Sequence, residues 1–465
     1  MTGRAGGRAA ALLLSGVALL LVAGCAVVPT SGPINEGPPL SRSDEGLVYR
    51  AIPAPPQPDM APEALVRAFL AASSSSTDDY AVARLFLTRE AADSWRPGEL
   101  VRVYDNTGLS LTATGQKVVA TGSLDGTIGA DGGYVVGDRG QRLSLTYRLA
   151  RVDGQWRISA PPDGLTLGTG DISREFRTYN LHFFDPTFSV LVPDPVTVPV
   201  SGAGVATGLV RDLLRGPTSW LAPAVRTAFP DGTTLALESV PVDNGIARVA
   251  LSSQVLAADP RTRAALSAQL VWTLRQLPNV SGVAITVAGQ PLTVPGAGPV
   301  QETEMWSNVD ATAPLVSPTP LYAAARSGLR TLDGGKLVPA AGPAGAGKPR
   351  LTRPAVSNDA TRLAGISPDR RELLVQQAVE GADPTRLIDD GTDLSAPSWD
   401  RNGDLWVVDR GRGILVVADD KVSQVPLVDL PDGLRAKDAV GISLAPDGTR
   451  AALLMRRGTR VEPWL

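Results

Sequence analysis

The 465-residue chain has few of the side chains that most enzymes use for catalysis, because it contains one cysteine, Cys25, and one histidine, His182. Single copies allow no intramolecular disulfide and no His-rich or Cys-rich zinc site, and a Ser-His-Asp or Cys-His pair would have to use His182. Basic and acidic residues are nearly balanced, 44 against 47, so no basic stripe is available to neutralise phosphates. The composition argues against the commonest hydrolases and a nucleic-acid partner, and it predicts no metal and no cofactor.

Long hydrophobic runs are also scarce, and the one near the start of the chain is short. Arg4 and Arg8 precede an uncharged apolar stretch from Ala9 to Ala23, which has the order of a secretory signal. The stretch has about 15 residues, whereas a helix that crosses a bilayer needs roughly 20. The sequence therefore predicts an exported protein with a signal peptide over residues 1–24, and it disfavours a permanent transmembrane helix.

Small residues end this run directly before the single cysteine. Val22, Ala23, Gly24 and Cys25 resemble the lipobox of bacterial lipoproteins. The resemblance implies that signal peptidase cleaves between Gly24 and Cys25 and that the Cys25 thiol is diacylated. Several acyl chains make a stable membrane anchor, whereas one does not. It implies a lipid-anchored protein on the outer face of the plasma membrane. The alternative is a free thiol that follows a signal peptide.

Residues 25–60 begin with this candidate lipid site and continue as a stretch rich in proline and glycine, which predicts an extended tether. Helical spacing of apolar residues begins at Pro62, and a second helical stretch follows near Tyr80 to Phe86. Alternating runs then predict strands that complete a sheet near Pro161, with a hairpin turn at Asp153-Gly154. These strands are Leu109 to Thr114, Lys117 to Thr121, and the two halves of Leu143 to Ile158. We expect an α+β domain over residues 61–175.

Residues 176–300 carry another pattern of strands and helices. The expected elements are a strand from Asn180 to Val192, a helix from Val205 to Leu214, a hairpin of Leu235 to Val242 and Ile246 to Leu251 around Asp243-Asn244-Gly245, a helix with Leu266, Leu270, Leu274 and Leu277 on one face, and a strand from Val283 to Val287. This order resembles the GerMN domain of spore-germination lipoproteins. The resemblance implies an α+β domain that binds partners and lacks catalytic residues.

A turn-strand phrase recurs in residues 311–465. Its aspartates, Asp369, Asp400 and Asp447, lie 31 and 47 residues apart, which suits propeller blades of about 40 residues. A blade cannot bury both of its faces alone, so neighbouring blades must stack around an axis. We expect an all-β propeller of at most four blades, with one strand after the last phrase and an incomplete ring. The fold class is therefore multidomain, with two α+β domains and a propeller.

Several residues have both a chemical and a structural interpretation. His182 lies in an alternating run, where the simpler interpretation is an imidazole ring at the surface of a sheet. Gly342, Gly347 and Lys348 have the spacing of a phosphate-binding loop. However, Pro349 replaces the hydroxyl residue that would hold Mg²⁺, and no apolar strand leads into the segment, which favours a flexible Ala-Gly linker.

The propeller aspartates and tryptophans also have two interpretations. Asp369, Asp400 and Asp447 could resemble a ligand set, but an aspartate in such a turn normally binds its own backbone amides. Trp399 and Trp406 could contact a ligand, although packing between blades is favoured. Paired carboxylates for glycoside hydrolysis are marked by no pattern. The residues predict that the chain is not an enzyme.

The order of lipobox, α+β domain, GerMN-like domain and propeller resembles the actinobacterial LpqB lipoproteins. Members of that family usually continue through more blades, so the resemblance implies a chain shortened at its carboxyl end. It also implies a partner, the extracytoplasmic domain of an MtrB-like sensor histidine kinase in an MtrAB-type two-component system, with effects on envelope homeostasis and cell division. The alternatives are a glycan- or lipid-binding protein or enzyme with its ligand at the propeller channel, and a scaffold for other envelope proteins.

Overall fold

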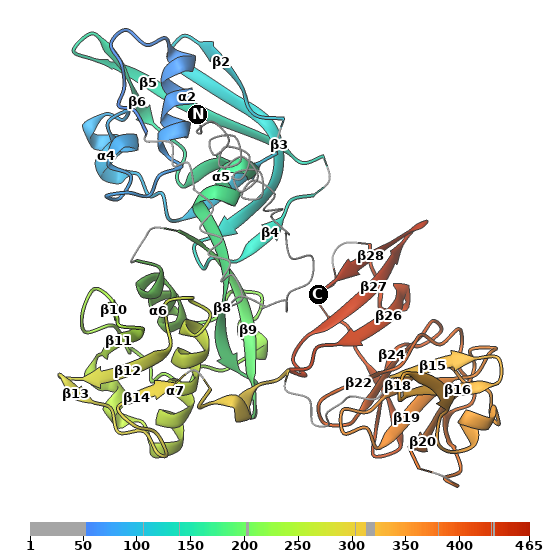
Figure 1. Ribbon diagram of the computed structural model, residues 1–465. Coiled ribbons are helices and arrows are strands. Elements are labelled where there is room, and N and C mark those ends of the chain that lie inside the picture. The colour runs from blue at the N-terminus through green and yellow to red at the C-terminus, as the bar shows by residue number, and fades with distance from the viewer. Residues whose placement is uncertain are drawn as a thin grey trace, which may run out of the picture. The chain divides into compact units, whose positions relative to one another are not determined.

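The fold is taken from a computed structural model, whose elements are labelled in Figure 1. It describes residues 53–105, 107–138, 140–200, 204–302, 304–312, 321–379, 381–428, 430 and 433–465. Within these ranges, no helix has the length and apolar character needed to span a membrane.

The first helix of this part is α2, Pro62–Ala72, which begins at the predicted proline, where a missing N–H costs no helical hydrogen bond. Its buried face carries the predicted apolar residues Leu65, Val66, Phe69 and Leu70. The second predicted helical stretch contains α3, Ala81–Arg84. A further helix, α4, Arg89–Ser94, was not predicted; the Thr88 hydroxyl caps it by accepting a hydrogen bond from the Ala91 amide at 3.3 Å.

A seven-stranded sheet packs on α2, with the order β6-β5-β3-β1-β7 and with β2 and β4 paired to β3. The predicted turn at Asp153-Gly154 is confirmed, since both residues have the positive φ that a tight hairpin needs. The sheet is not complete near Pro161, because β7 lies parallel to β1 and α5 follows it. The elements are β1 (Leu100–Tyr104), β2 (Ser110–Thr114), β3 (Lys117–Gly129), β4 (Tyr134–Val136), β5 (Arg142–Val152), β6 (Gln155–Ala160), β7 (Leu165–Gly168) and α5 (Thr169–Glu175).

The next region opens with a long hairpin of β8, Phe176–Phe184, and β9, Leu191–Pro199. The predicted single strand from Asn180 to Val192 was therefore wrong. The turn between the strands is held by the Asp185 carboxylate, which accepts hydrogen bonds from the amides of Thr187, Ser189 and Val190.

Two helices and a small sheet complete this region, and most of the predicted elements are present. The predicted turn at Asn244-Gly245 is confirmed by φ values of 50° and 80°. The predicted strand from Leu235 to Val242 is reduced to its last residue and Asp243; the rest is irregular. The elements are α6 (Val205–Arg215), α7 (Pro260–Leu274), β10 (Val242–Asp243), β11 (Ile246–Leu251), β12 (Gly282–Val287), β13 (Gln290–Pro291), β14 (Val300–Glu302) and the 3-10 helices η2 (Ala222–Ala224), η3 (Ser253–Ala257) and η4 (Ser307–Val309).

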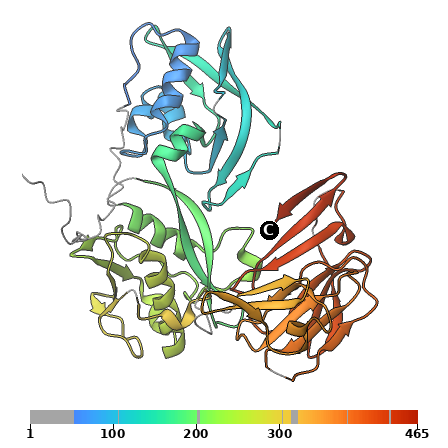
Figure 2. The ribbon, with the colours of Figure 1, turned by 45° about the vertical axis from the view of Figure 1, so that its right-hand side comes forward.

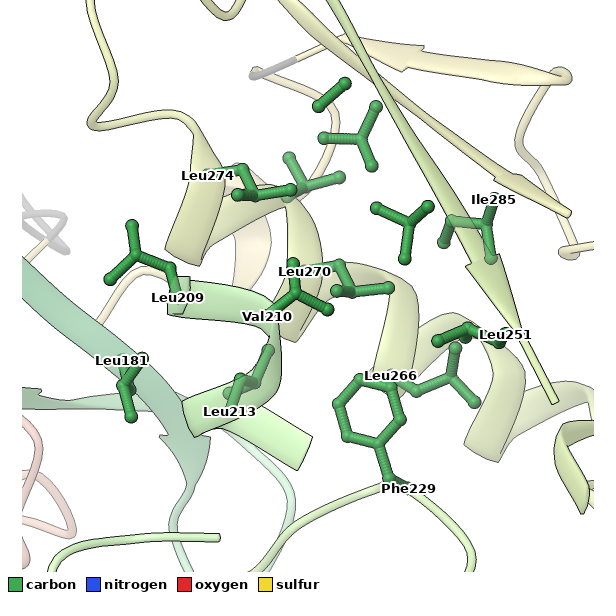
Figure 3. Packing of buried hydrophobic residues seen from close by; sticks show 14 of the residues in the cluster. Leu181, Leu209, Val210, Leu213, Phe229, Leu251, Leu266, Leu270, Leu274 and Ile285 are labelled. Carbon is green, nitrogen blue, oxygen red and sulfur yellow. The ribbon is translucent and has the colours of Figure 1, made fainter. Parts of the chain in front are cut away.

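The core of this region lies between the helices and the sheet (Figure 3). β11 and β12 are parallel, and α7 supplies the crossover between them. Leu277, predicted on the face of α7, is buried but lies beyond the end of that helix. The labelled core residues are Leu181, Leu209, Val210, Leu213, Phe229, Leu251, Leu266, Leu270, Leu274 and Ile285.

Four consecutive antiparallel sheets follow among the described residues (Figures 1 and 2), and we call them propeller sheets one to four. The first and fourth have three strands, and the second and third have four. They consist of β15 (Tyr322–Ala325), β16 (Gly328–Asp333) and β17 (Lys336–Pro339); β18 (Thr352–Val356), β19 (Arg362–Ile366), β20 (Leu373–Gln377) and β21 (Thr385–Ile388); β22 (Ser398–Trp399), β23 (Leu405–Asp409), β24 (Gly413–Ala418) and β25 (Lys421–Val425); and β26 (Ala439–Leu444), β27 (Ala451–Arg457) and β28 (Arg460–Trp464).

Neighbouring propeller sheets are joined by separate buried clusters. Leu329 and Leu363 belong to the cluster between sheets one and two. Ile366 and Leu405 belong to the cluster between sheets two and three, and Val408 and Ile442 to that between sheets three and four. This arrangement is the stacking that a propeller requires. The expectation of one strand after the last turn phrase was wrong, because a turn at Gly458 leads into β28.

Candidate functional site

The predicted lipid site lies outside the described residues. Val22, Ala23, Gly24 and Cys25 all fall in residues 1–52, so their assignment as lipobox, cleavage site and acylated thiol stays a prediction. The residues singled out for possible chemistry after Cys25 are all described.

His182 lies in β8 and is buried. Its backbone is attached to α7, since its amide donates to the Thr273 hydroxyl at 3.2 Å and its carbonyl accepts from Gln269 Nε2 at 2.8 Å. The imidazole packs edge-on against Trp272, with ring centroids 5.5 Å apart, and its Nδ1 has no hydrogen-bond partner within the described part of the chain. The predicted position of this ring at a sheet surface was wrong, because the ring is buried against Trp272 of α7.

This environment determines the charge of His182. Burial lowers its pKa to about 3, the positive charge of Arg275 contributes in the same direction, and Asp310 has a smaller opposite effect. The ring is therefore neutral at physiological pH. No group of three or more His, Cys, Asp and Glu side chains suited to a metal ion occurs among the described residues. The arrangement at His182 fits a packing role.

Asp400 and Asp447 stabilise the first turn of propeller sheets three and four. The Asp400 carboxylate accepts hydrogen bonds from the amides of Asn402 and Asp404, both at 2.9 Å, and from Trp406 Nε1 at 2.9 Å. The Asp447 carboxylate accepts from the Thr449 amide at 2.8 Å and from Arg450 Nη2 at 2.7 Å. Burial raises the pKa of Asp447, but hydrogen bonds from Arg450 and Thr449 outweigh it and hold the pKa below its usual value. The structural interpretation of these two turns is confirmed.

Asp369 is also a turn residue, but it is not equivalent to the other two. It lies in the second hairpin of its sheet, between β19 and β20, where it accepts hydrogen bonds from Ser367 Oγ and the Arg371 amide. The equivalent of Asp400 is Asp359, in the turn between β18 and β19, where it accepts from Ser357 Oγ at 2.6 Å. The repeat aspartates are therefore 41 and 47 residues apart. Asp359 was not predicted, although Ser357-Asn358-Asp359 resembles Ser367-Pro368-Asp369.

The two tryptophans singled out in the propeller, Trp399 and Trp406, pack within and between sheets, as predicted. Trp399 is 8% exposed, its Nε1 donates to the Ala355 carbonyl at 3.1 Å, and the Arg362 guanidinium lies 4.5 Å from its ring centroid. Trp406 donates to Asp400. The indole N–H groups of both tryptophans therefore donate hydrogen bonds within the protein.

The segment that resembles a phosphate-binding loop is packed, and the flexible-linker interpretation was wrong. Residues Pro343–Ala346 form a 3-10 helix, η5, in which Ala344 and Gly345 are buried. A Cβ on Gly345 would lie 1.8 Å from the Ala340 carbonyl oxygen, so only glycine fits. The segment fills space in the first sheet.

Comparison with protein families agrees with this division of the chain. Residues 55–173 match the model "Lipoprotein LpqB, N-terminal domain", residues 180–293 match "Sporulation and spore germination", and residues 327–462 match "Lipoprotein LpqB beta-propeller domain". The chain is 39% identical to Lipoprotein LpqB of Thermobifida fusca over 88% of this chain and 67% of that protein. The chain belongs to the LpqB lipoprotein family. Its multidomain fold class, with two α+β domains and a propeller, is confirmed.

Other members of the LpqB family are similar over nearly the whole chain. Lipoprotein LpqB of Streptomyces coelicolor is 32% identical over 97% of this chain and 77% of that protein. Among solved structures, the first GerMN domain of the sporulation protein GerM from Bacillus subtilis aligns with 27% of this chain and 95% of its own length, at 21% identity and a TM-score of 0.23.

Proposed function

We propose that this chain is a non-enzymatic, lipid-anchored protein that binds and modulates an MtrB-like sensor histidine kinase outside the cytoplasm, with effects on envelope homeostasis and cell division. The observation that carries the proposal is the combination of a lipobox-like segment ending at Cys25 with the three modules of a family whose members are named lipoproteins. The link to the kinase comes from the resemblance to that family.

The side chains support a role in binding. The single histidine is buried and neutral at physiological pH, and the turn aspartates of the propeller are occupied by hydrogen bonds from their own turns. A histidine enclosed in the core and aspartates bound by their own turns contribute to folding, and neither is available as a general base.

Anchoring gives such a binder a physical mechanism of control. A partner that prefers one kinase state shifts the kinase equilibrium by the difference between its two affinities. When both proteins are held at one membrane, the second contact becomes effectively intramolecular, so weak binding has a large effect. The anchor on Cys25 therefore matters as much as the interface.

A binding titration tests the proposed partner. Residues 26–465 would be titrated against the purified extracytoplasmic domain of the MtrB-like kinase from the same organism, with residues 176–300 alone alongside. We expect saturable binding by the longer chain, and binding by the shorter one would assign the contact to the GerMN-like region. Absence of binding by a chain with a cooperative unfolding transition would contradict the proposal.

The lipid anchor has its own test. Cys25→Ala should abolish incorporation of labelled fatty acid and leave unprocessed precursor, because no other thiol is available in the chain. The matched control is Ala23→Gly, which keeps a small residue in the predicted lipobox and should still be labelled. Labelling of the Cys25→Ala protein would show that the acyl chain is attached elsewhere and would contradict the anchor at Cys25.

A further inference from the structure

A cavity of about 410 Å³ opens on the surface of the GerMN-like region. Its walls are the end of β8 with the following turn, the first turns of α7, and the segment from Trp306 to Val309. The last wall lies outside residues 180–293, the range matched by the spore-germination family model. The volume falls within the roughly 300–1,000 Å³ typical of small-molecule sites.

The turn after β8 presents an aromatic ring to this cavity. Phe188 is 37% exposed and has a φ of 57°, a conformation that bulky side chains rarely adopt. The buried Asp185 carboxylate stabilises this conformation through the amides of Ser189 at 2.7 Å and Val190 at 2.8 Å. The Phe188 ring stacks on Phe184, with centroids 5.4 Å apart and planes at 27°. Two stacked rings are therefore fixed in position before any ligand arrives.

The opposite walls keep the cavity open and apolar. The face of α7 that lines it carries Ala264, Ala265 and Ala268, and larger side chains there would fill the space. The Trp306 ring is held in place because its Nε1 donates to Gln301 Oε1 at 2.9 Å, and its carbonyl accepts from Trp272 Nε1 at 3.0 Å. The site is thus built from supported side chains on three elements.

Among the described residues that line the cavity, Arg261 alone is charged. Within the described part of the chain, its guanidinium makes no hydrogen bond or ion pair. The nearest carboxylate in sequence belongs to Asp259, and it already accepts a hydrogen bond from the Thr262 amide at 2.8 Å. The positive charge of Arg261 helps to lower the pKa of Asp259, after the larger effect of this hydrogen bond. No acidic residue is among the described residues that line the cavity, so its electrostatic preference is for an anion.

We propose that this cavity binds a small organic acid with a flat apolar body. The body would lie against Phe184, Phe188 and Trp306, and the acid group would pair with Arg261 at the mouth. A charged group at one end of an aromatic slot selects ligands by both shape and charge. The inference goes beyond the proposed kinase binding and does not depend on it.

Calorimetric titration of the full chain in lipid nanodiscs with naphthalene-1-acetate tests this site, with empty nanodiscs as the blank. The neutral naphthalene-1-acetamide has nearly the same shape and serves as the matched probe. We expect saturable one-to-one binding of the acid and roughly tenfold weaker binding of the amide, the range of one charge-assisted contact. Lack of saturable acid binding, or equal affinities for both probes, would overturn the proposal.

Variants assign the binding to the cavity. Arg261→Gln should weaken the acid roughly tenfold and leave the amide unchanged, whereas Arg248→Gln, an exposed arginine of β11 outside the cavity, should leave both unchanged. Phe188→Gly should weaken both probes, because it removes the ring while glycine readily adopts a φ of 57°. Equal effects of Arg261→Gln and Arg248→Gln, or unchanged binding by a folded Phe188→Gly protein, would place the probe elsewhere and refute the site.

Discussion

The GerMN-like region and the propeller sheets bury their apolar side chains in different ways. Among the described residues of the first, one large cluster of 30 buried residues joins both helices to the β8–β9 hairpin and the small sheet, and a smaller cluster of five lies beside α7. In the second, three clusters of six to ten buried residues lie between neighbouring sheets. A change in one large cluster affects every element around it, whereas a change between stacked sheets affects mainly two neighbours. The comparison predicts one cooperative unit in the first region and separable interfaces in the second.

The largest effect is expected at the centre of the large cluster of the GerMN-like region. Leu270→Ala should lower the free energy of unfolding of the GerMN-like region by about 3–5 kcal/mol, because Leu270 is fully buried and its truncation leaves a cavity. Hydrogen exchange should show loss of protection in α6, α7, β11 and β12 together. Leu256→Ala, at a position 52% exposed, is the control and should change little. Loss of hydrogen-exchange protection confined to α7 would contradict the expectation of one cooperative unit.

A smaller and more local effect is expected in the propeller. Asp400→Ala should cost about 2 kcal/mol, because it leaves two turn amides and Trp406 Nε1 without their acceptor. The loss of hydrogen-exchange protection should be limited to sheet three and its neighbours. Asp369→Ala is the control, since that carboxylate is exposed and should cost less. Equal loss of protection in sheet one would show that the sheets unfold as one unit.

A loss of stability similar to that of Asp400→Ala is expected in the GerMN-like region when the pH falls. The folded pKa of His182 is about 3, so the folded state holds its ring neutral while the unfolded state takes up a proton below its ordinary pKa of about 6.5. Stability is therefore full above pH 6.5 and is lost as pH falls towards 3. Between pH 7 and 5 the loss should be about 2 kcal/mol. Denaturant unfolding at both pH values measures it.

His182→Phe is the matched variant for this measurement, because it keeps an aromatic ring against Trp272 and removes the only imidazole in the chain. Its stability should fall less than that of the natural protein over the same pH interval. Identical pH profiles would show that His182 is already accessible to protons in the folded state.

Local patterns predicted much of this fold, because they depend on neighbours in sequence. The start of α2 at Pro62, the turns at Asp153-Gly154 and Asn244-Gly245, and the turn role of Asp400 all follow from backbone preferences or short-range hydrogen bonds. These features need no knowledge of tertiary contacts.

The errors occurred where distant contacts decide the structure. Nothing local in Leu165–Gly168 marks its parallel pairing with β1. Apolar residues on both sides of Asp185 hid the turn that its carboxylate forms, and the buried position of Gly345 depends on Ala340. The cavity around Phe188 was missed because its walls come from three separate segments. The lipid site at Cys25 remains a prediction from sequence.

Kinase output in proteoliposomes tests the central claim most directly. The full-length MtrB-like kinase would be reconstituted with the lipidated protein, or with residues 26–465 added outside at the same total concentration, and its autophosphorylation rate measured. The account predicts that the lipidated protein changes the rate and that the unanchored form does so only at much higher concentration, because the anchor supplies the effective concentration. An unchanged rate at saturating lipidated protein would contradict it.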